Sequence, residues 1–570
     1  MTTENAHKPG RWWVCPAAGL THAALTYAAG PTLGWWWLAL VSAVPLMWAA
    51  ANAHRPWWRA WLLTTIGVLP LWLAWEWWVL DVSELGMVPL AAIVSLLVSA
   101  YVPLVAWLRH RLPRVPWMVL AASAWTGVEF GRGEVFMDGY AWGFAAHPLI
   151  DAPLLAAPAA WGGFYLVSLL VALLGAAMVG AGARPARGAA ARAGVCAAVL
   201  GLCAAAWWTG RQATAGEVVG VAAVQTNLPQ DNKLDWTLED EVRDMARFET
   251  LTRQAAAGGP VLIAWPETMM PGLSLEPDAV RVLAGLEWKL ADGSALPGDE
   301  FALRLVALQR ELGVPMLVGE EARVGTRVER AADGGLRVPC DRHYNSVYLV
   351  SGGRIGAARY DKVRLTPFGE TMPYIRAWPW LQQQMLDLGA GGMTFDLSEG
   401  SELTVFEVTR GGVTLRAVTP VCFESTEASL CRRMVFDRGE RRADLIVNVT
   451  NDGWFGGSRV ARIQHLQMAR WRSLETGTPA LRAANTGVSA VIDRRGRVIA
   501  SGVDGTPGAM GQDGVLSAEI ELPRGATAYA SLGDAAGWGS LGVLGVLVAT
   551  GLVKGRVSNS TGRGRRADKR

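Results

Sequence analysis

Val261-Leu262-Ile263-Ala264-Trp265-Pro266-Glu267 is an apolar run that ends in a carboxylate. A short apolar run with β-branched residues and a proline close behind it is typical of a buried strand that ends in a turn. A carboxylate at the end of such a strand is partly desolvated, which raises its affinity for a proton and suits a general base. The stretch therefore predicts a sheet with a chemically useful side chain at its edge.

Runs of the same kind recur through residues 215–525 and alternate with segments whose apolar residues have helical spacing. The expected strands are Val218–Val224, Val261–Ala264, Pro315–Gly319, Ser346–Val350, Val413–Val421, Leu445–Val449, Ser489–Ile492 and Leu516–Ile520. The expected helices are Thr237–Ala257, Glu300–Leu312 and Arg462–Thr476, and the stretches 291–299 and 325–342 are expected to be surface insertions. Mixed strands and helices predict a layered α/β domain over 215–525.

The first 209 residues have a different composition. Of the 28 tryptophans, 20 lie before position 211, a region with only eight Asp and Glu. Apolar stretches near the roughly 20 residues that a helix needs to cross a bilayer recur there. The expected spans are 14–30, 33–51, 57–80, 87–108, 115–131, 153–181 and 189–208, with one more near 530–553. Residues 1–209 therefore predict a transmembrane bundle of about seven spans and residues 528–555 a C-terminal transmembrane helix, while the first stretch could also lie in the membrane interface.

Charges between the spans predict their orientation, because Lys and Arg accumulate in short loops on the cytoplasmic side. Arg55, Arg59 and Arg109 fall in loops on one side, together with the basic tail at 556–570, whereas Asp81 falls on the other. This alternation places both termini in the cytoplasm and residues 215–525 outside it. The tail is either a solvated, disordered end or a contact for lipid headgroups.

Several other function classes are excluded. A net charge of +3, concentrated at the end of the chain, does not indicate nucleic acid. Six cysteines without a C-x-x-C pair predict neither a disulfide framework nor a metal site. His343 and His465 lack partners at metal-ligand spacing and are expected to be ordinary loop and helix residues. Glu76 is expected at the membrane interface, and Glu129 and Arg132 are expected to pair structurally.

Three polar motifs follow expected strands: Trp265-Pro266-Glu267, Tyr360-Asp361-Lys362 and Pro420-Val421-Cys422-Phe423-Glu424. A thiol is only a few per cent thiolate near neutrality, so a catalytic cysteine needs a base and a donor for the oxyanion. Glu267, Lys362 and Cys422 would supply base, cation and nucleophile, with the backbone N–H of Phe423 as a second donor. Taken singly, each also fits a structural role, such as packing or a surface ion pair.

The order Glu267, Lys362, Cys422 resembles the catalytic triad of the nitrilase superfamily. A membrane bundle before the domain and one span after it resembles bacterial apolipoprotein N-acyltransferases. Further matching motifs are Tyr344-Asn345-Ser346, Pro367-Phe368-Gly369-Glu370, Asn448-Val449-Thr450-Asn451-Asp452-Gly453-Trp454-Phe455-Gly456, Gln464-His465-Leu466-Gln467 and Arg482-Ala483-Ala484-Asn485-Thr486-Gly487. The resemblance implies a polytopic membrane protein of the bacterial inner membrane with a periplasmic nitrilase-like αββα sandwich.

The same resemblance implies a two-step acyl transfer without a cofactor. Cys422 takes an acyl chain from a phospholipid as a thioester, and the α-amine of a diacylglyceryl-cysteine at the N-terminus of an apolipoprotein then receives it. Supporting roles are implied for Glu370, Glu424 and Phe423. A substrate pocket is expected to include Trp236, Trp454, Tyr344 and Asn345.

Three departures from the family pattern concern the substrate side of the site. Phe423 stands where a tyrosine is usual and Thr371 where an aromatic is common, and the region 275–312 is longer than typical. Two alternative functions share the same residues: a membrane-tethered amide hydrolase that uses water, and a non-enzymatic membrane protein that binds lipid or lipoprotein. The intact Glu267, Lys362 and Cys422 favour an enzyme.

Overall fold

The computed structural model describes residues 13–82, 86–136, 139–180, 185–212, 216–229, 236–330, 335–367, 369–372, 378, 380, 384, 397–502 and 510–567. Phe368 of the Pro-Phe-Gly-Glu motif, residues 331–334 of one expected insertion and residues 568–570 of the tail lie outside this range. The chain divides into two compact units. One unit comprises Gln212–Ser531, and the other comprises Met1–Arg211 with Leu532–Arg570.

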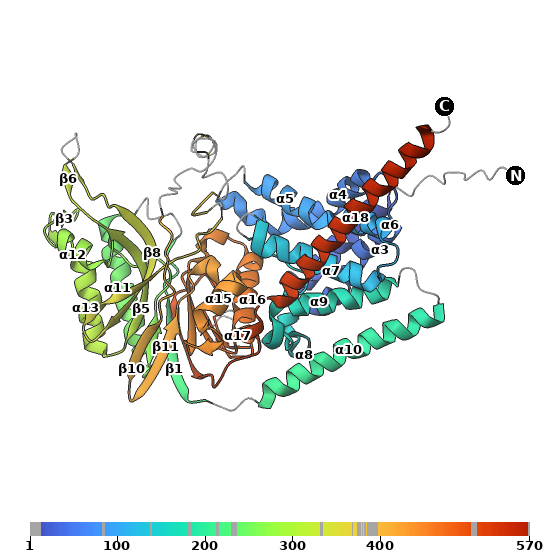
Figure 1. Ribbon diagram of the computed structural model, residues 1–570. Helices are drawn as coiled ribbons and strands as arrows, with labels where there is room; N and C mark the ends of the chain where they lie inside the picture. Colours follow the sequence, from blue (N-terminus) through green and yellow to red (C-terminus); the bar gives the residue numbers. More distant parts are fainter. Residues whose placement is uncertain are drawn as a thin grey trace. The chain divides into compact units, whose positions relative to one another are not determined.

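The unit Gln212–Ser531 contains two six-stranded sheets, each with three parallel strands at its centre (Figure 1). In the first sheet the order is β18 (Gly514–Glu521), β1 (Val218–Gln225), β2 (Leu262–Ala264), β5 (Met316–Val324), β8 (Arg342–Ser351) and β9 (Arg354–Asp361). In the second it is β10 (Phe406–Arg410), β11 (Val413–Val418), β14 (Leu445–Thr450), β15 (Ala480–Ala484), β16 (Ala490–Ile492) and β17 (Val498–Ser501).

Helices cover the outer face of each sheet. They are α11 (Leu238–Ala257), α12 (Pro277–Leu283) and α13 (Glu300–Leu312) on the first sheet, and α15 (Ala428–Val435) and α16 (Arg459–Thr476) on the second. Val221 of β1 packs in a cluster that includes Leu415 and Leu445 of the second sheet, whereas its neighbour Ala222 packs against Phe248 of α11. Successive strand residues face opposite sides, so this alternation produces a four-layer αββα sandwich.

Local signals place several of these elements. Thr237 caps α11 with a reciprocal pair of bonds to Asp240, which satisfies backbone donors at the helix start. The expected insertion 325–342 carries a mostly exposed hairpin of β6 (Glu329–Arg330) and β7 (Leu336–Arg337). The expected insertion 291–299 contains β4 (Ala295–Pro297), which pairs with β3 (Glu287–Lys289) just before it. A third hairpin pairs β12 (Phe436–Asp437) with β13 (Glu440–Arg441). His343 lies in β8 rather than in a loop, 2.9 Å from Glu321.

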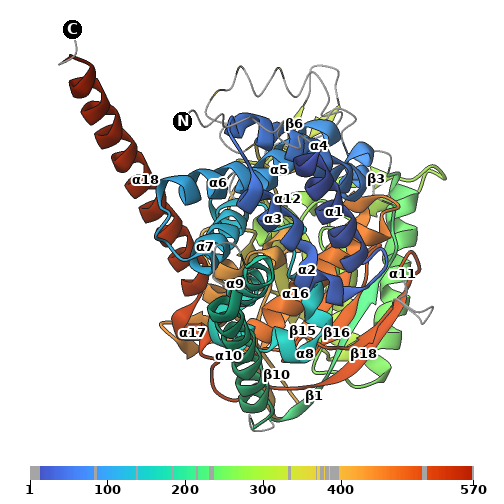
Figure 2. The ribbon, with the colours of Figure 1, turned by 90° about the vertical axis from the view of Figure 1, so that its right-hand side faces the viewer.

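The second unit is helical. Its main helices are α1 (Val14–Ala29), α3 (Val44–Asn52), α4 (Trp57–Trp75), α5 (Met87–Ser99), α6 (Tyr101–Arg111), α7 (Trp117–Phe130), α9 (Ala159–Val179), α10 (Pro185–Gln212) and α18 (Ala535–Ala567). By length and composition, four stretches of the described residues can cross a membrane: Met87–Arg111, Ala159–Val179, Gly188–Gln212 and Ala535–Lys554. Leu170 of α9 packs against Val199 and Cys203 of α10. The helices α9 and α10 are neighbours in Figure 2.

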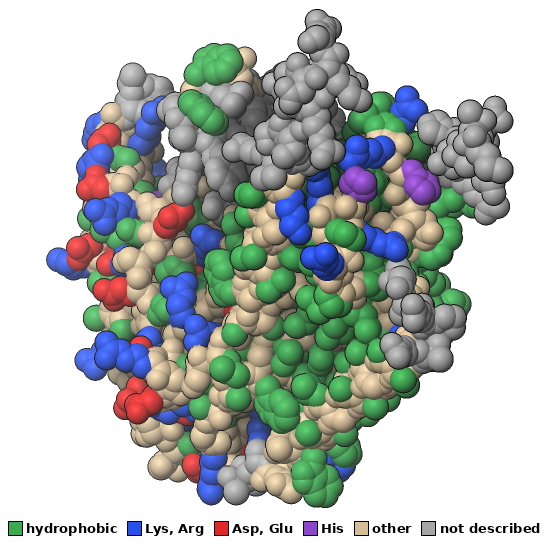
Figure 3. Space-filling view, turned by 45° about the vertical axis from the view of Figure 1, so that its right-hand side comes forward, with side chains coloured by type: hydrophobic (Ala, Val, Ile, Leu, Met, Phe, Trp, Pro, Cys, Tyr) green, Lys and Arg blue, Asp and Glu red, His purple; other side chains and the backbone are tan. Residues whose placement is uncertain are grey.

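The surface of the helical unit is apolar. Ile66, Trp208 and Val546 are each more than 60% exposed, and hydrophobic side chains gather over its face in Figure 3. Soluble monomers rarely expose apolar patches of this extent. Lipid is the environment that such a surface fits.

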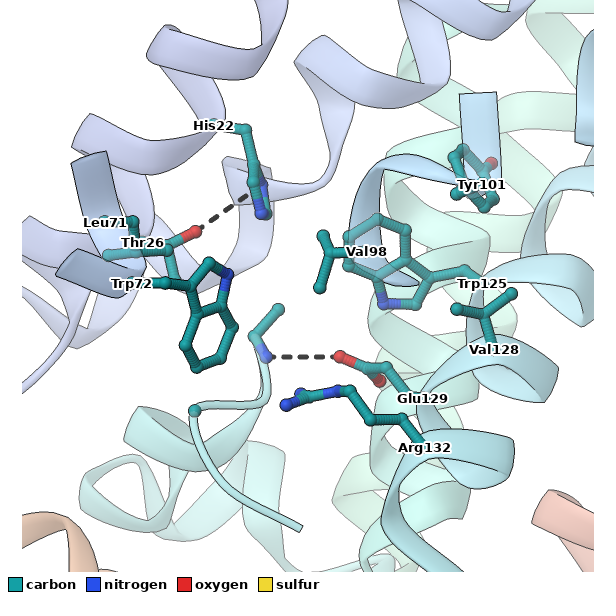
Figure 4. Close-up of a pocket in the computed structure, with 12 residues that line it drawn as sticks. His22, Thr26, Leu71, Trp72, Val98, Tyr101, Trp125, Val128, Glu129 and Arg132 are labelled. Atoms are coloured by element: carbon teal, nitrogen blue, oxygen red, sulfur yellow. Dashed lines mark hydrogen bonds between the residues drawn. The ribbon is translucent and has the colours of Figure 1, made fainter. Parts of the chain in front are cut away.

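Several charged side chains are buried inside the helical unit. Glu76 is fully buried within the unit and accepts a 2.6 Å hydrogen bond from Tyr140. Glu129 and Arg132 line one pocket (Figure 4) and attract each other electrostatically, as expected, and each also has hydrogen-bond partners of its own. Glu129 accepts from the backbone of Ala145 at 3.2 Å and from Ser168, whereas Arg132 donates to the carbonyl of Trp142 at 2.8 Å.

Candidate functional site

Glu267 follows β2, the middle strand of the parallel trio in the first sheet. Its carboxylate is 4% exposed. One oxygen accepts from the backbone N–H of Asn451 at 2.8 Å, and the other accepts from the side-chain amide of Asn345 at 2.7 Å. These bonds fix both oxygens of the carboxylate in a nearly dry site.

Lys362 follows β9 and is 1% exposed. Its Nζ lies 2.7 Å from Glu370 and 3.5 Å from Glu267, and it donates to the hydroxyl of Thr366 at 3.3 Å. Burial lowers the pKa of this ammonium, but the carboxylates of Glu370 and Glu267 outweigh burial and hold the pKa well above its usual value. Lys362 is therefore a fixed positive charge at neutral pH.

Cys422 begins the 3-10 helix η7 (Cys422–Thr426), just after β11. Its φ is +49°, in the left-handed region that L-residues other than glycine seldom adopt. Burial and the negative charge of Glu267 raise the pKa of the thiol well above 9.0, although Lys362 and a hydrogen bond to Thr450 act in the opposite direction. The structure thus brings Glu267, Lys362 and Cys422 together, with a neutral thiol in the resting site.

Glu424 lies directly under this turn and is fully buried. Its carboxylate accepts hydrogen bonds from the backbone N–H groups of Val421, Val363 and Arg364 at 2.8–2.9 Å and from the hydroxyl of Tyr360 at 2.9 Å. Burial raises the pKa of Glu424 to about 7. One side chain therefore ties the turn that carries Cys422 to the loop that carries Lys362.

The residues expected to support the site or to line a substrate pocket are spread over several elements of the domain. Asn345 of β8 bridges Glu267 and Glu370, at 2.7 and 3.2 Å. Tyr344, its neighbour in the strand, belongs to the hydrophobic cluster beneath α11 and α13, and Trp236 packs against the same cluster. Phe423 is buried in η7, and Trp454 lies partly buried in η8 (Asp452–Phe455). Of these five residues, Asn345 is the one whose side chain is seen to hydrogen-bond Glu267 in the described part of the chain.

The expectation that His465 is an ordinary helix residue is wrong. Its ring is 1% exposed, with Nδ1 3.0 Å from Asp452 and Nε2 3.1 Å from the carbonyl oxygen of Cys422. Asp452 follows the strand β14, just as Glu267 follows β2. A polar residue directly after an apolar run was therefore the sequence signal that could have identified Asp452. In the part of the chain that the structure describes, no cluster of His, Cys, Asp and Glu could hold a metal ion.

Two family models match the chain. The family model for the apolipoprotein N-acyltransferase N-terminal domain matches residues 22–177, and the carbon-nitrogen hydrolase model matches residues 220–529. An amidase from Nesterenkonia sp. is a structural neighbour with 16% identity and a TM-score of 0.32, covering 55% of this chain and 93% of that chain.

Curated relatives match nearly the whole chain. An apolipoprotein N-acyltransferase of Ralstonia nicotianae is 30% identical over 94% of this chain and 93% of its own length. One of Azotobacter vinelandii is 30% identical over 92% of both chains, and one of Geobacter metallireducens is 29% identical over 88% of this chain and 84% of its own. Two domain matches in the same order and full-length relatives lead to one conclusion: the chain is an acyltransferase that belongs to the apolipoprotein N-acyltransferase family.

Proposed function

We propose that the chain transfers an acyl chain from a phospholipid, through a thioester on Cys422, to the α-amine of a diacylglyceryl-cysteine at the N-terminus of an apolipoprotein. The observation that carries this proposal is the buried cluster in which Glu267 and Lys362 both act on the thiol of Cys422. The names of the relatives supply the substrate class.

In the first half-reaction, Glu267 takes the proton of the thiol as Sγ attacks the ester carbonyl of the phospholipid. A base is necessary because burial keeps the thiol protonated. The ammonium of Lys362 and the N–H of Phe423 stabilise the tetrahedral oxyanion. When the intermediate collapses, the lysophospholipid alkoxide takes the proton from Glu267 and leaves the thioester.

In the second half-reaction, the α-amine of the lipoprotein attacks the thioester carbonyl and Glu267 accepts a proton from the nitrogen. Collapse forms the amide and breaks the C–S bond, and the leaving thiolate takes the proton back from Glu267. The free Cys422 thiol is regenerated. Glu370 keeps Lys362 in place through both steps, and Trp454 lines the acyl pocket.

The membrane arrangement is part of the proposal. We infer about eight spans, seven within 1–209 and one within 528–555, in the bacterial cytoplasmic membrane. The catalytic domain, 215–525, faces the periplasm, and both termini with the basic tail 556–570 are cytoplasmic. Support comes from the apolar helices and from Arg55, Arg59 and Arg109, which fall on the predicted cytoplasmic side.

Transfer of a labelled acyl chain to a synthetic diacylglyceryl lipopeptide, with purified protein in phospholipid micelles, tests the function. Wild type and Cys196→Ala should N-acylate the peptide, because Cys196 lies in α10 of the helical unit. Cys422→Ala should give no product, and Glu267→Gln should lose at least about 10²-fold in rate. Release of free fatty acid with no lipopeptide product would instead indicate a hydrolase.

A further inference from the structure

A second buried polar cluster lies behind Cys422 and has no part in the proton transfers above. It consists of Asp452, His465 and Arg482, which are 0%, 1% and 0% exposed. Arg482 donates to both carboxylate oxygens of Asp452 at 2.7 Å, and Thr450 donates to one of them at 3.0 Å. Buried charges are costly unless they are paired and hydrogen-bonded, and this cluster meets both conditions.

The cluster reaches the nucleophile through His465. Nε2 lies 3.1 Å from the carbonyl oxygen of Cys422. We assign the ring proton to Nε2, because the carbonyl oxygen only accepts, the Ser425 hydroxyl that lies 3.2 Å from Nε2 donates to that same carbonyl, and Nδ1 can accept from Arg482. On the other side of the ring, Nδ1 lies 3.0 Å from Asp452 and 3.1 Å from Arg482, which fixes the ring plane.

The same helix supports the turn at a second point. Arg472 of α16 lies seven residues after His465, so both side chains emerge from one face of the helix. Arg472 donates to the carbonyl of Thr426 at 2.9 Å, and Ser425 donates to the carbonyl of Cys422, also at 2.9 Å. Hydrogen bonds from His465 and Ser425 therefore fix the carbonyl at the start of η7, and a hydrogen bond from Arg472 fixes the carbonyl at its end.

Holding this carbonyl has a consequence on the other side of the peptide. The peptide that joins Cys422 to Phe423 is planar and trans, so its C=O and its N–H point in opposite directions. Fixing the carbonyl oxygen towards α16 directs the N–H of Phe423 away from α16. The left-handed conformation of Cys422 costs roughly 1–2 kcal/mol relative to an ordinary one, so the turn needs such anchors to keep its shape.

We propose that His465, held by Asp452 and Arg482, is a positioning residue that aims the Phe423 N–H at the oxyanion by fixing the carbonyl of Cys422. The inference rests on the proposed acyl transfer. It assigns His465 no contact with the substrate and no proton transfer.

Two reactions of Cys422 distinguish a positioning role of His465 from a general disruption of the site. Acylation by a phospholipid passes through an oxyanion, whereas alkylation by iodoacetamide is a direct displacement at carbon that forms none. In His465→Leu, acylation should fall by about 10- to 100-fold, part of the 10²–10³ that a lost oxyanion donor costs, while alkylation should stay within about threefold. His465→Gln, whose amide can still donate, should recover most of the acylation rate. Ser425→Ala, which removes the other donor, should show a smaller loss of the same kind.

Met468→Ala is the matched control, because Met468 is buried in the same helix and has no polar role. The truncation destabilises the core and should leave both rates unchanged below the melting temperature. Equal acylation by wild type and His465→Leu, or equal losses in acylation and alkylation, would overturn the inference. If His465→Leu does not fold, the acylation and alkylation rates of His465→Gln and Ser425→Ala test the inference instead. A wild type that forms no thioester overturns the proposed function, and the inference with it.

Discussion

Replacing Lys362 with methionine separates the structural role of this ammonium from its catalytic one. Lys362 lies between the carboxylates of Glu370 and Glu267, at 2.7 and 3.5 Å, and is 1% exposed. Methionine fills a similar volume but leaves the buried carboxylate of Glu267 and the partly buried carboxylate of Glu370 without their cation. Breaking a buried ion pair in this way costs about 3–5 kcal/mol, so the melting temperature should fall clearly.

The loss of the oxyanion donor should in addition lower the rate of Cys422 acylation by about 10²–10³-fold. The double variant Lys362→Met with Glu370→Gln removes one of the unpaired charges. It should regain much of the melting temperature and none of the acylation rate. The assay is a pair of measurements on each variant: thermal unfolding in detergent and single-turnover acylation by a labelled phospholipid. Acylation by Lys362→Met within tenfold of wild type, or its recovery in the double variant, would refute the assigned role.

Other outcomes follow from the same site. Since burial and Glu267 raise the pKa of Cys422 above 9.0, alkylation of the free enzyme by iodoacetamide should stay slow at pH 7–8.5 and accelerate only above pH 9; a plateau reached below pH 8 would contradict a neutral resting thiol. A Cβ at position 487 would overlap the carboxylate of Asp452, whereas one at position 457 would meet open space. Gly487→Ala should therefore lose acylation by at least about tenfold, by displacing the support of His465, and Gly457→Ala should keep it; equal rates in the two would show that Asp452 is dispensable. Glu424→Ala leaves three backbone N–H groups without their acceptor, at a cost of about 1–3 kcal/mol each. The melting temperature should therefore fall more than in the control Glu407→Ala, which changes an exposed residue of β10. An equal effect of the two substitutions would show that Glu424 does not hold the two loops together.

Local patterns were sufficient for much of the fold. The helix Glu300–Leu312 and the strand that leads to Glu267 lie where apolar spacing placed them, because both signals are contained in a few neighbouring residues. β9 was missed because it is half exposed and has no apolar run, and β15 because its sequence, Ala480-Leu481-Arg482-Ala483-Ala484, has a charged residue at its centre.

Tertiary contacts account for what the sequence could not predict. Arg482 can be buried in a strand because Asp452, 30 positions earlier, neutralises it. His465 is next to the nucleophile because α16 packs behind η7, which connects positions 43 apart. Glu76 is fully buried and accepts a hydrogen bond from Tyr140, 64 positions later. Spacing rules describe neighbours along the chain and carry no information on such partners.

The covalent state of Cys422 is the most direct test of the account. Purified protein should be incubated with a phospholipid of defined acyl chains and no acceptor, and its intact mass and peptides should be measured. We expect one acyl chain on the peptide that contains Cys422, stable in water and released on addition of a diacylglyceryl lipopeptide with a free α-amine. Lipopeptide acylation without any acyl mass on Cys422, or an acyl chain that persists in Cys422→Ala, would contradict it.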